Sequence, residues 1–451
     1  MVAAALAAYW LPGNDRIYNH FVWQALAFLD GRVWIDWPVP GFPDGNEWMQ
    51  DVYPLSELDG STFGALLPFP PLPAIVLLPF AAIWGLATDI RAVSVGLGAI
   101  AVGLAWWALA ALPVSRRIRL ATVVFLGFGT VFWYAAQLGT TWFFAHVVAV
   151  TLLLLALGVA LRGDPDADAE PTEDDHPAIA LRSGLAQLAR PLELLDRRQF
   201  LAGLLFGLAA TARLTVVFGA PFFMLVGGGG SWARRSFSAG LGAIIPVGAL
   251  LAYNLATTGH VLHPGYEYQY QREARGYQVL GYNPDWAIED IRYLPQNLEI
   301  FLLATPAVLP DRLPDAYAQP GEPACTEPGA ERGLFDEDCP IAIPRTIGMS
   351  ILLTSPAYLL LLPALLRRRS RLVAGGYLAV LAIAFVNLLH FSQGWVNFGY
   401  RFSNDFVVFA LPLIALGMAR RGGVGWTGAG LIALSVAINL WGVIWGNILG
   451  W

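Results

Sequence analysis

Apolar runs of about 20 residues recur along the chain, and they restrict its fold more than any other feature, because a helix of about 20 apolar residues crosses a bilayer. The runs cover 92–113, 120–138, 143–161, 236–256, 346–366, 372–391, 405–419 and 427–449. Only 13% of the 451 residues are charged, against roughly 25% in globular proteins. The sequence therefore predicts an all-α fold, a polytopic transmembrane helical bundle of about ten or eleven segments in the cell membrane.

The basic residues predict which side of the membrane each connection faces. All 27 are arginines, and cytoplasmic loops are rich in lysine and arginine. The clusters that we assign to the cytoplasm are Arg116/Arg117/Arg119, Arg197/Arg198, Arg234/Arg235, Arg367/Arg368/Arg369/Arg371 and Arg420/Arg421. The polar stretch 163–198 is then cytoplasmic, and the long polar segment 257–345 is extracytoplasmic. The net charge of −6 gives no indication of nucleic-acid binding.

The chain has only two cysteines, Cys325 and Cys339, and both lie within 257–345. Disulfides are typical of exported segments. We therefore predict a bond between these two residues, with a pair of free thiols as the alternative. Their position agrees independently with the side of the membrane predicted from the arginines.

The segment LLPFPPLPAIVLLPF (66–80) is apolar but contains five prolines. Proline removes a backbone donor and blocks a regular helix, so we predict that 66–86 lies at the outer membrane face, or dips in and returns. The run at 1–11 is about half as long as a span; it is either a stub or the remainder of a truncated helix.

The chain is thus expected to divide into three parts. A transmembrane module occupies 1–256, with an outer loop at 12–64, a juxtamembrane segment at 65–90 and the cytoplasmic loop at 163–198. An extracytoplasmic loop with the disulfide follows at 257–345, and C-terminal transmembrane helices occupy 346–451.

Arg213 interrupts the apolar stretch 200–226. Both ends of this stretch adjoin arginine clusters assigned to the cytoplasm, so it must cross the membrane an even number of times. We predict a bent hairpin with Arg213 near its tip; one long helix with a snorkelling arginine is the alternative. A buried arginine costs about 2.5–3.5 kcal/mol on insertion scales and normally faces a polar cavity.

Five short motifs follow one another in the first 225 residues. They are Asn14-Asp15-Arg16-Ile17-Tyr18, ALAFLDGRVWID (25–36), Pro70-Pro71-Leu72-Pro73, GTTWFFAH (139–146) and GLLFGLAATAR (203–213). In this order the chain resembles the GT-C superfamily of membrane glycosyltransferases, which includes the protein O-mannosyltransferases, the aminoarabinose transferases of lipid A and family-39-like relatives. The resemblance implies a GT-C-like fold and a hexosyl- or pentosyltransferase that uses a polyprenyl-phosphate-linked sugar donor at the extracytoplasmic face.

The resemblance also implies which residues form the site. A carboxylate would act as general base on the acceptor hydroxyl, and cations would stabilise the leaving phosphate. The family's aspartate usually stands where this chain has Asn14, so Asp15, one place on, and Asp51 in EWMQDVYP both remain candidate bases. The candidate substrate-binding residues are Arg16, Tyr18, His146, Arg213, Tyr400 and Arg401. The expected partners are the lipid-linked donor and membrane lipids.

The sequence does not indicate a cofactor. It contains no cysteine–histidine cluster with the spacing of a metal site; a divalent ion held by loop carboxylates is compatible with it, but no pattern indicates one. Two alternatives to an active transferase stay open, namely a polytopic transporter or lipid flippase, and a catalytically inactive relative. Transporters often contain repeated halves with matching broken helices, and this sequence has one broken hairpin without a counterpart.

Overall fold

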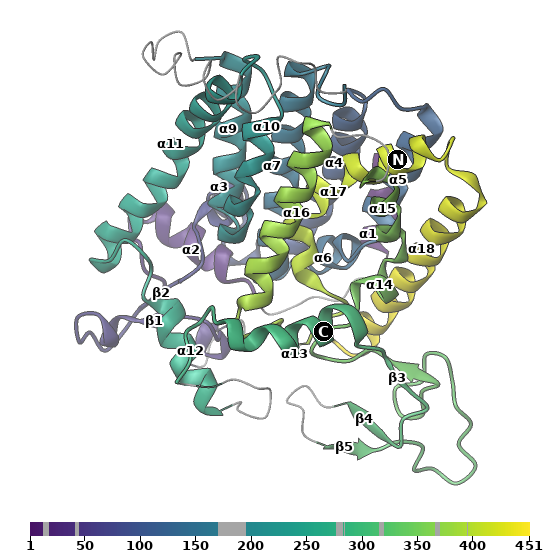
Figure 1. The fold of residues 1–451 in the computed structure, drawn as a ribbon. Helices are drawn as coiled ribbons and strands as arrows, with labels where there is room; N and C mark the ends of the chain where they lie inside the picture. Colours follow the sequence, from purple (N-terminus) through teal and green to yellow (C-terminus); the bar gives the residue numbers. More distant parts are fainter. Residues whose placement is uncertain are drawn as a thin grey trace.

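The computed structural model describes residues 1–11, 18–40, 45–169, 195–276, 283, 285–314, 320–365, 370–394 and 396–451. Within these ranges the chain is an all-α membrane bundle, whose helices pack side by side (Figure 1). The helices are α1 (Val2–Trp10), α2 (His20–Leu29), α3 (Leu72–Trp84), α4 (Ile90–Leu109), α5 (Arg116–Phe128), α6 (Phe132–Leu138), α7 (Thr141–Gly163), α9 (Arg197–Ala210), α10 (Ala220–Leu225), α11 (Trp232–Thr258), α12 (Gly265–Gly276), α13 (Leu294–Leu303), α14 (Ile351–Thr354), α15 (Leu362–Leu365), α16 (Arg371–Leu389), α17 (Val407–Arg420) and α18 (Gly425–Ile448).

Five of the described helices are long and apolar enough to cross a membrane: α4, α7, α11, α16 and α18. Helices α5 and α6 form a sixth candidate, which is bent by 49° at the break between them. The apolar run predicted at 405–419 corresponds to the shorter apolar helix α17. The run 346–366, predicted as one helix, is instead broken into α14, a 3-10 helix at Pro356–Leu361 and α15. Pro356 and Pro363 account for the breaks, because proline cannot donate a helical hydrogen bond.

The helix ends that carry the described arginines of the predicted set gather at one end of the bundle, the upper end in Figure 1. Arg367, Arg368 and Arg369 lie outside the described residues. Arg371 at the start of α16 donates to both oxygens of Asp164, which follows α7, over 2.7 and 3.0 Å. Arg420 at the end of α17 donates to Asp168 over 3.2 Å. We call this region the arginine end; it comprises Arg116, Arg119, Arg162, Arg198, Arg234, Arg371, Arg420 and Arg421.

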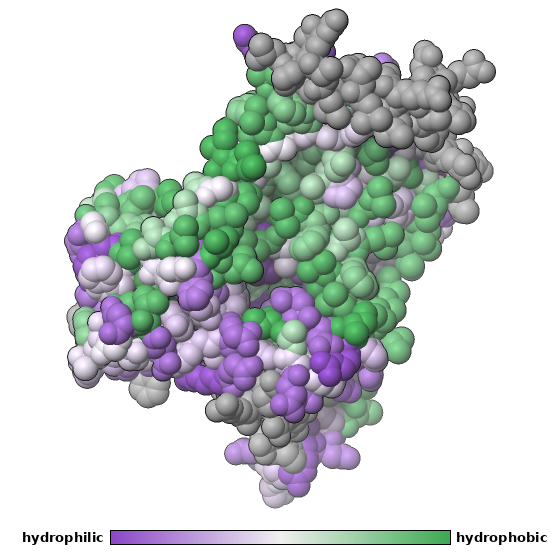
Figure 2. All heavy atoms as spheres, turned by 60° about the vertical axis from the view of Figure 1, so that its left-hand side comes forward, coloured by the Kyte–Doolittle hydropathy of each residue, from purple (hydrophilic) through white to green (hydrophobic). Residues whose placement is uncertain are grey.

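The opposite end, which we call the loop end, carries the described parts of the segments 18–69 and 259–350 (Figure 1). Short antiparallel pairs brace it: β1 (Tyr53–Pro54) with β2 (Ala65–Leu66), β3 (Ala307–Val308) with β6 (Ala342–Ile343), and β4 (Arg312–Pro314) with β5 (Pro320–Pro323). Cys325 and Cys339 form the predicted disulfide, with their Cα atoms 4.4 Å apart. Figure 2 shows hydrophobic residues over the upper part of one face and hydrophilic residues below them. This distribution fits an apolar body in the membrane with a polar loop end outside it.

The proline-rich segment contains helix α3, which begins at Leu72, within the part predicted to be irregular, and continues through Pro79. Pro73 lies in its first turn, where a missing amide hydrogen has little cost. The helix has 13 residues and rises about 20 Å, less than the roughly 30 Å of a bilayer core. Leu66 before α3 belongs to a loop-end sheet, and Leu86 after it packs against the loop-end cluster that contains Met49. Both ends of α3 therefore adjoin the loop end.

This placement makes the side of the membrane testable. We expect a cysteine introduced at the exposed Ala87, just after α3, to be labelled by an impermeant maleimide from outside intact cells. The native cysteines are bonded to each other and should not react. As a control, Arg421→Cys at the arginine end should be labelled only after permeabilisation. Labelling of Ala87→Cys only after permeabilisation would show that α3 belongs to a true crossing.

The stretch around Arg213 forms the predicted hairpin. Helix α9 ends at Ala210, and the chain returns through a 3-10 helix at Leu214–Gly219 and through α10. Gln199, near the start of α9, donates from Nε2 to the carbonyls of Phe223 and Val226 over 2.6 and 3.2 Å. The start and the end of the hairpin are therefore joined at the arginine end, with Arg213 at the tip, and the alternative of one long helix is wrong.

The hairpin is held against α11 by close backbone contact. A Cβ atom at Gly203 would lie 2.0 Å from the carbonyl oxygen of Ala239, and one at Gly242 would lie 2.2 Å from that of Phe200. Small residues allow such approach between membrane helices. The glycines of GLLFGLAATAR thus have a packing role that fixes the position of Arg213.

Candidate active site

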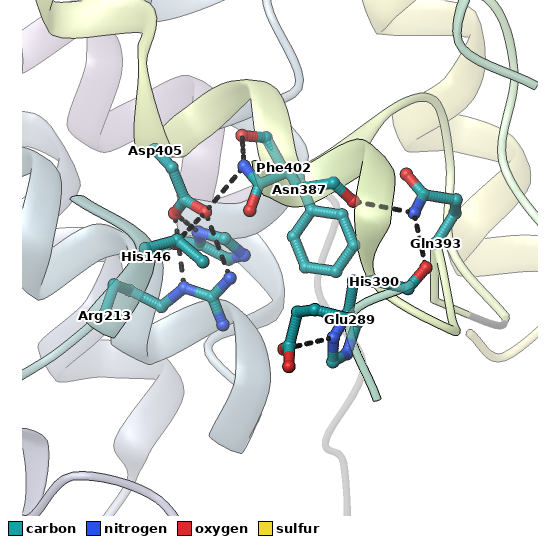
Figure 3. A network of polar contacts seen from close by, with 9 residues as sticks. His146, Arg213, Glu289, Asn387, His390, Gln393, Phe402 and Asp405 are labelled. Atoms are coloured by element: carbon teal, nitrogen blue, oxygen red, sulfur yellow. Dashed lines mark hydrogen bonds and ion pairs between the residues drawn. The ribbon is translucent and has the colours of Figure 1, made fainter. Parts of the chain in front are cut away.

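A buried carboxylate, Asp405, joins three parts of the chain at the tip of the hairpin (Figure 3). It ends the 3-10 helix that leads into α17, and its side chain is 0% exposed. Arg213 donates to both of its oxygens, from Nε over 3.2 Å and from Nη2 over 3.1 Å. Thr215 Oγ1 donates over 2.7 Å, and Asn387 Nδ2 of α16 donates over 3.2 Å. An ionised carboxylate only accepts hydrogen bonds, so this set of donors stabilises the charged form of Asp405.

His146 of α7 completes the cluster from the other side. Its Nδ1 lies 2.9 Å from Asp405 Oδ1, and its side chain is 1% exposed. Because the carboxylate can only accept, Nδ1 carries the hydrogen and the neutral ring has a free lone pair at Nε2. That Nε2 is buried and has no hydrogen-bond partner within the described ranges. Buried polar atoms are rarely left unsatisfied, so Nε2 is a position for a bound ligand.

The ring of Phe402 is a meeting point of charged and titratable groups (Figure 3). The guanidinium carbons of Arg213 and Arg401 lie 5.4 and 5.0 Å from its centroid. The rings of His146 and His390 meet it at 6.3 and 6.2 Å. Cations are attracted to the face of an aromatic ring, so Phe402 holds two arginines near one another at the edge of the buried cluster.

The orientation of Arg213 leaves one of its nitrogens unused. Nε and Nη2 face Asp405, whereas the third nitrogen points away from that carboxylate in Figure 3. The side chain is 20% exposed. Two guanidinium groups therefore lie at the ring of Phe402, and guanidinium groups are well suited to bind an anionic ligand such as phosphate.

A second cluster surrounds Asp51 at the loop end. Asp51 has a φ of 60°, in the left-handed region that aspartate tolerates better than most residues. Its Oδ2 accepts a hydrogen bond from the indole Nε1 of Trp142 over 2.7 Å. The loop is therefore fastened to the first turn of α7 by the side chain of Asp51 itself.

The side chain of His20, at the start of α2, binds a backbone carbonyl group of the same loop. The side chain is fully buried, with Nε2 2.6 Å from the carbonyl oxygen of Gln50 and Nδ1 2.8 Å from Thr141 Oγ1. The carbonyl can only accept, so Nε2 carries a hydrogen. Thr141 also donates to the carbonyl of Tyr18 over 3.1 Å. The residue before Asp51 is thus fixed to both α2 and α7.

The two clusters lie along one face of α7. Trp142, which holds Asp51, and His146, which contacts Asp405, are four residues apart, and such residues share a helix face about 6 Å apart along the axis. Tyr266 of α12 connects the clusters electrostatically. Burial raises its pKa to about 12; Arg213 lowers it, and Asp51 and Glu289 raise it. Charges from both clusters therefore act at one place.

The structure brings most of the predicted site residues together. His146, Arg213 and Arg401 surround Phe402, while Asp51 and Tyr18 meet at Trp142, whose ring lies 5.0 Å from that of Tyr18. Tyr400 is buried against the ring of Phe301 at 4.8 Å. Asp15 and Arg16 lie outside the described residues. In the part of the chain that the structure describes, no group of three or more metal-ligating side chains occurs.

Sequence reasoning missed the centre of the site. Asp405, Thr215, Asn387 and His20 were not candidates, although Asp405 ends the motif NFGYRFSND. A signal was available, because an arginine inside a membrane protein requires a nearby anion. Asp405 lies two residues before the apolar helix α17, so it was a carboxylate close to the membrane-embedded part of the sequence.

The chain was compared with protein families, with characterised proteins and with solved structures. No family model matches the chain, and no characterised protein matches it in sequence. Among solved structures, the chain is similar to the oligosaccharyltransferase of Archaeoglobus fulgidus in its apo form, with 12% identity and a TM-score of 0.38. The match covers 99% of this chain and 55% of that one, so the chain spans about half the length of the oligosaccharyltransferase. The function proposed below therefore rests on the residues of this chain.

Proposed function

We propose that this chain is a membrane glycosyltransferase that moves a sugar from a polyprenyl-phosphate carrier to an acceptor hydroxyl at the extracytoplasmic face. The observation that carries the proposal is the arrangement on α7. There, Trp142 holds a candidate base, Asp51, one helical turn from His146 and the buried pair of Asp405 and Arg213. A base and a cationic site at this separation suit a sugar held between an acceptor and a phosphate.

In the proposed reaction, Asp51 takes the proton of the acceptor hydroxyl as its oxygen bonds to the anomeric carbon of the sugar. The bond between that carbon and the phosphate oxygen breaks, and its electron pair leaves with the lipid phosphate. The unused nitrogen of Arg213 and the guanidinium of Arg401 would stabilise the developing charge, because arginine matches phosphate oxygens with several donors. His146 Nε2 would accept a hydrogen bond from a sugar hydroxyl.

A lipid flippase is the second candidate that the buried cluster supports. Ionisable residues inside membrane proteins mark substrate and proton pathways as well as catalytic sites, and the contacts from His146 through Asp405 to Arg213 cross the interior between α7 and α9. The two proposals differ in the fate of the bond between sugar and phosphate, which a transferase breaks and a flippase leaves intact.

Proteoliposomes that contain the purified chain should therefore release polyprenyl phosphate and label an acceptor fraction from cell envelopes. The probes are polyprenyl-phosphate mannose, glucose and arabinose, each with a radiolabelled sugar. We expect Arg401→Gln to raise the KM for the active donor by at least about ten-fold, since one charge-assisted contact of about 1.5–3 kcal/mol is lost. Arg312→Gln, in strand β4, is the matched control and should leave KM unchanged. Transfer of the intact donor between leaflets, without loss of its sugar, would identify a flippase instead.

A further inference from the structure

A cavity of about 450 Å³ lies at the arginine end, well away from the loop-end carboxylate Asp51. Helices α1, α4 and α5 form it, and the residues that line it are Met1, Val2, Gly103, Trp106, Arg116 and Leu120. Arg116 is the one charged side chain among them, and the other side chains are largely apolar. Leu120 is 45% exposed, so the cavity opens at the surface of the bundle. Its lining suits an apolar chain with a negative group at one end.

The arginines beside this cavity differ from Arg371 and Arg420, which are paired with Asp164 and Asp168. By contrast, within the described ranges no carboxylate pairs with any arginine in the first turn of α5, namely Arg116, Arg117 and Arg119. Three neighbouring positive charges at the start of a helix, where the helix dipole is also positive, create a site for an anion.

The side chain of Trp106 holds two of these arginines at the rim of the cavity. The guanidinium carbons of Arg119 and Arg116 lie 5.0 and 6.0 Å from the centroid of its ring. Contact with the ring occupies the face of a guanidinium and leaves its edge available for hydrogen bonds. The Nε of Arg119 is also buried without a hydrogen-bond partner among the described residues, so the cluster has donors to offer.

We infer that the chain binds an anionic phospholipid here, independently of the proposed transferase site. The lipid phosphate lies against the first turn of α5, where Arg116 and Arg119 donate to its oxygens. One acyl chain enters the cavity beside Val2, Gly103 and Leu120. Basic pockets between membrane helices on the cytoplasmic side suit anionic headgroups, and the arginine end is the side that the positive-inside rule assigns to the cytoplasm.

Native mass spectrometry of the detergent-purified chain tests this site. Titration with phosphatidylglycerol should show saturable binding that phosphatidylcholine with the same acyl chains does not match. Each arginine near a lipid surface contributes about 1 kcal/mol, so the double variant Arg116→Gln/Arg119→Gln should bind phosphatidylglycerol roughly 30-fold more weakly. The control Arg234→Gln/Arg421→Gln removes the same charge from elsewhere at the arginine end and should bind like the unmodified chain.

A second variant keeps the test valid if the loss of two arginines disturbs folding. Leu120→Trp retains every charge but fills the apolar part of the cavity, and it should also weaken phosphatidylglycerol binding. The inference is overturned if phosphatidylcholine binds as tightly as phosphatidylglycerol, if the control double variant loses as much affinity as Arg116→Gln/Arg119→Gln, or if Leu120→Trp binds like the unmodified chain.

Discussion

Replacement of Asp405 by asparagine is expected to lower the free energy of unfolding by about 3–5 kcal/mol, the cost of leaving one partner of a buried ion pair without the other. Asparagine has nearly the same shape as aspartate, so packing is conserved. The change in the free energy of unfolding therefore measures the loss of the negative charge. The asparagine amide keeps one acceptor oxygen and puts an NH2 group in place of the other, so Arg213 would keep at most one of its two contacts and would lose the attraction between opposite charges. The measurement is an equilibrium unfolding titration of the purified chain in mixed micelles.

Two further variants test whether the loss of stability comes from an uncompensated buried charge. In Asp405→Leu/Arg213→Met both charges are absent, and replacement of a whole buried pair by apolar residues is often close to neutral; we expect this double variant to be more stable than Asp405→Asn. Asp36→Asn breaks the exposed pair between Arg32 and Asp36 and should cost less than about 1 kcal/mol. Equal stability of Asp405→Asn and the unmodified chain would contradict a buried ion pair at the hairpin tip.

Replacement of Asp51 by asparagine is expected to reduce transfer at least about 100-fold in kcat, the lower range of the contribution of a general base. The structure explains why the fold should survive. Asparagine tolerates the left-handed backbone at this position as well as aspartate does, and its amide oxygen can still accept from Trp142. The readouts are kcat and KM for the active donor in proteoliposomes, together with the unfolding titration.

The matched control is Asp59→Asn, which changes a carboxylate on the same loop that accepts a hydrogen bond from the backbone of Ser61 over 2.9 Å; it should keep full activity. Trp142→Phe removes the donor that fixes Asp51 and should reduce kcat less than Asp51→Asn does, because the carboxylate remains but is no longer held. Asp15 stays a rival base. If Asp15→Asn and Asp51→Asn each retain full transfer, the proposed mechanism is wrong.

The features that could be predicted from sequence are those set by neighbouring residues or by the membrane itself. Apolar length predicted the long helices, and the arginine clusters predicted a common end. The parity of crossings around Arg213 predicted the hairpin that Gln199 closes. The disulfide could be predicted because Cys325 and Cys339 are the only two cysteines of the chain and lie in one predicted extracytoplasmic loop. Each of these inferences needs a local pattern and one general rule.

The contacts that build the site depend on pairs far apart in the chain. Arg213 meets Asp405 across 192 positions, and Trp142 meets Asp51 across 91. Composition and periodicity contain no information about which carboxylate approaches which arginine, since that is decided by how α7, α9 and α16 pack. The rule that a buried charge requires a counter-charge could have indicated Asp405, but it could not have indicated the role of His20, whose partners are a backbone carbonyl and a hydroxyl group, both uncharged.

The length of α9 determines how deep in the bilayer the side chain of Arg213 lies. Its 14 residues rise about 21 Å from the arginine end, whereas a hydrocarbon core is roughly 30 Å thick. The guanidinium at the tip therefore sits several ångströms short of the far headgroup plane, and a phosphate that meets it must sink below its neighbours or find the bilayer locally thinned. Under the proposed function, the depth of the hairpin tip therefore sets how far the phosphate of the donor has to sink before its sugar can be recognised.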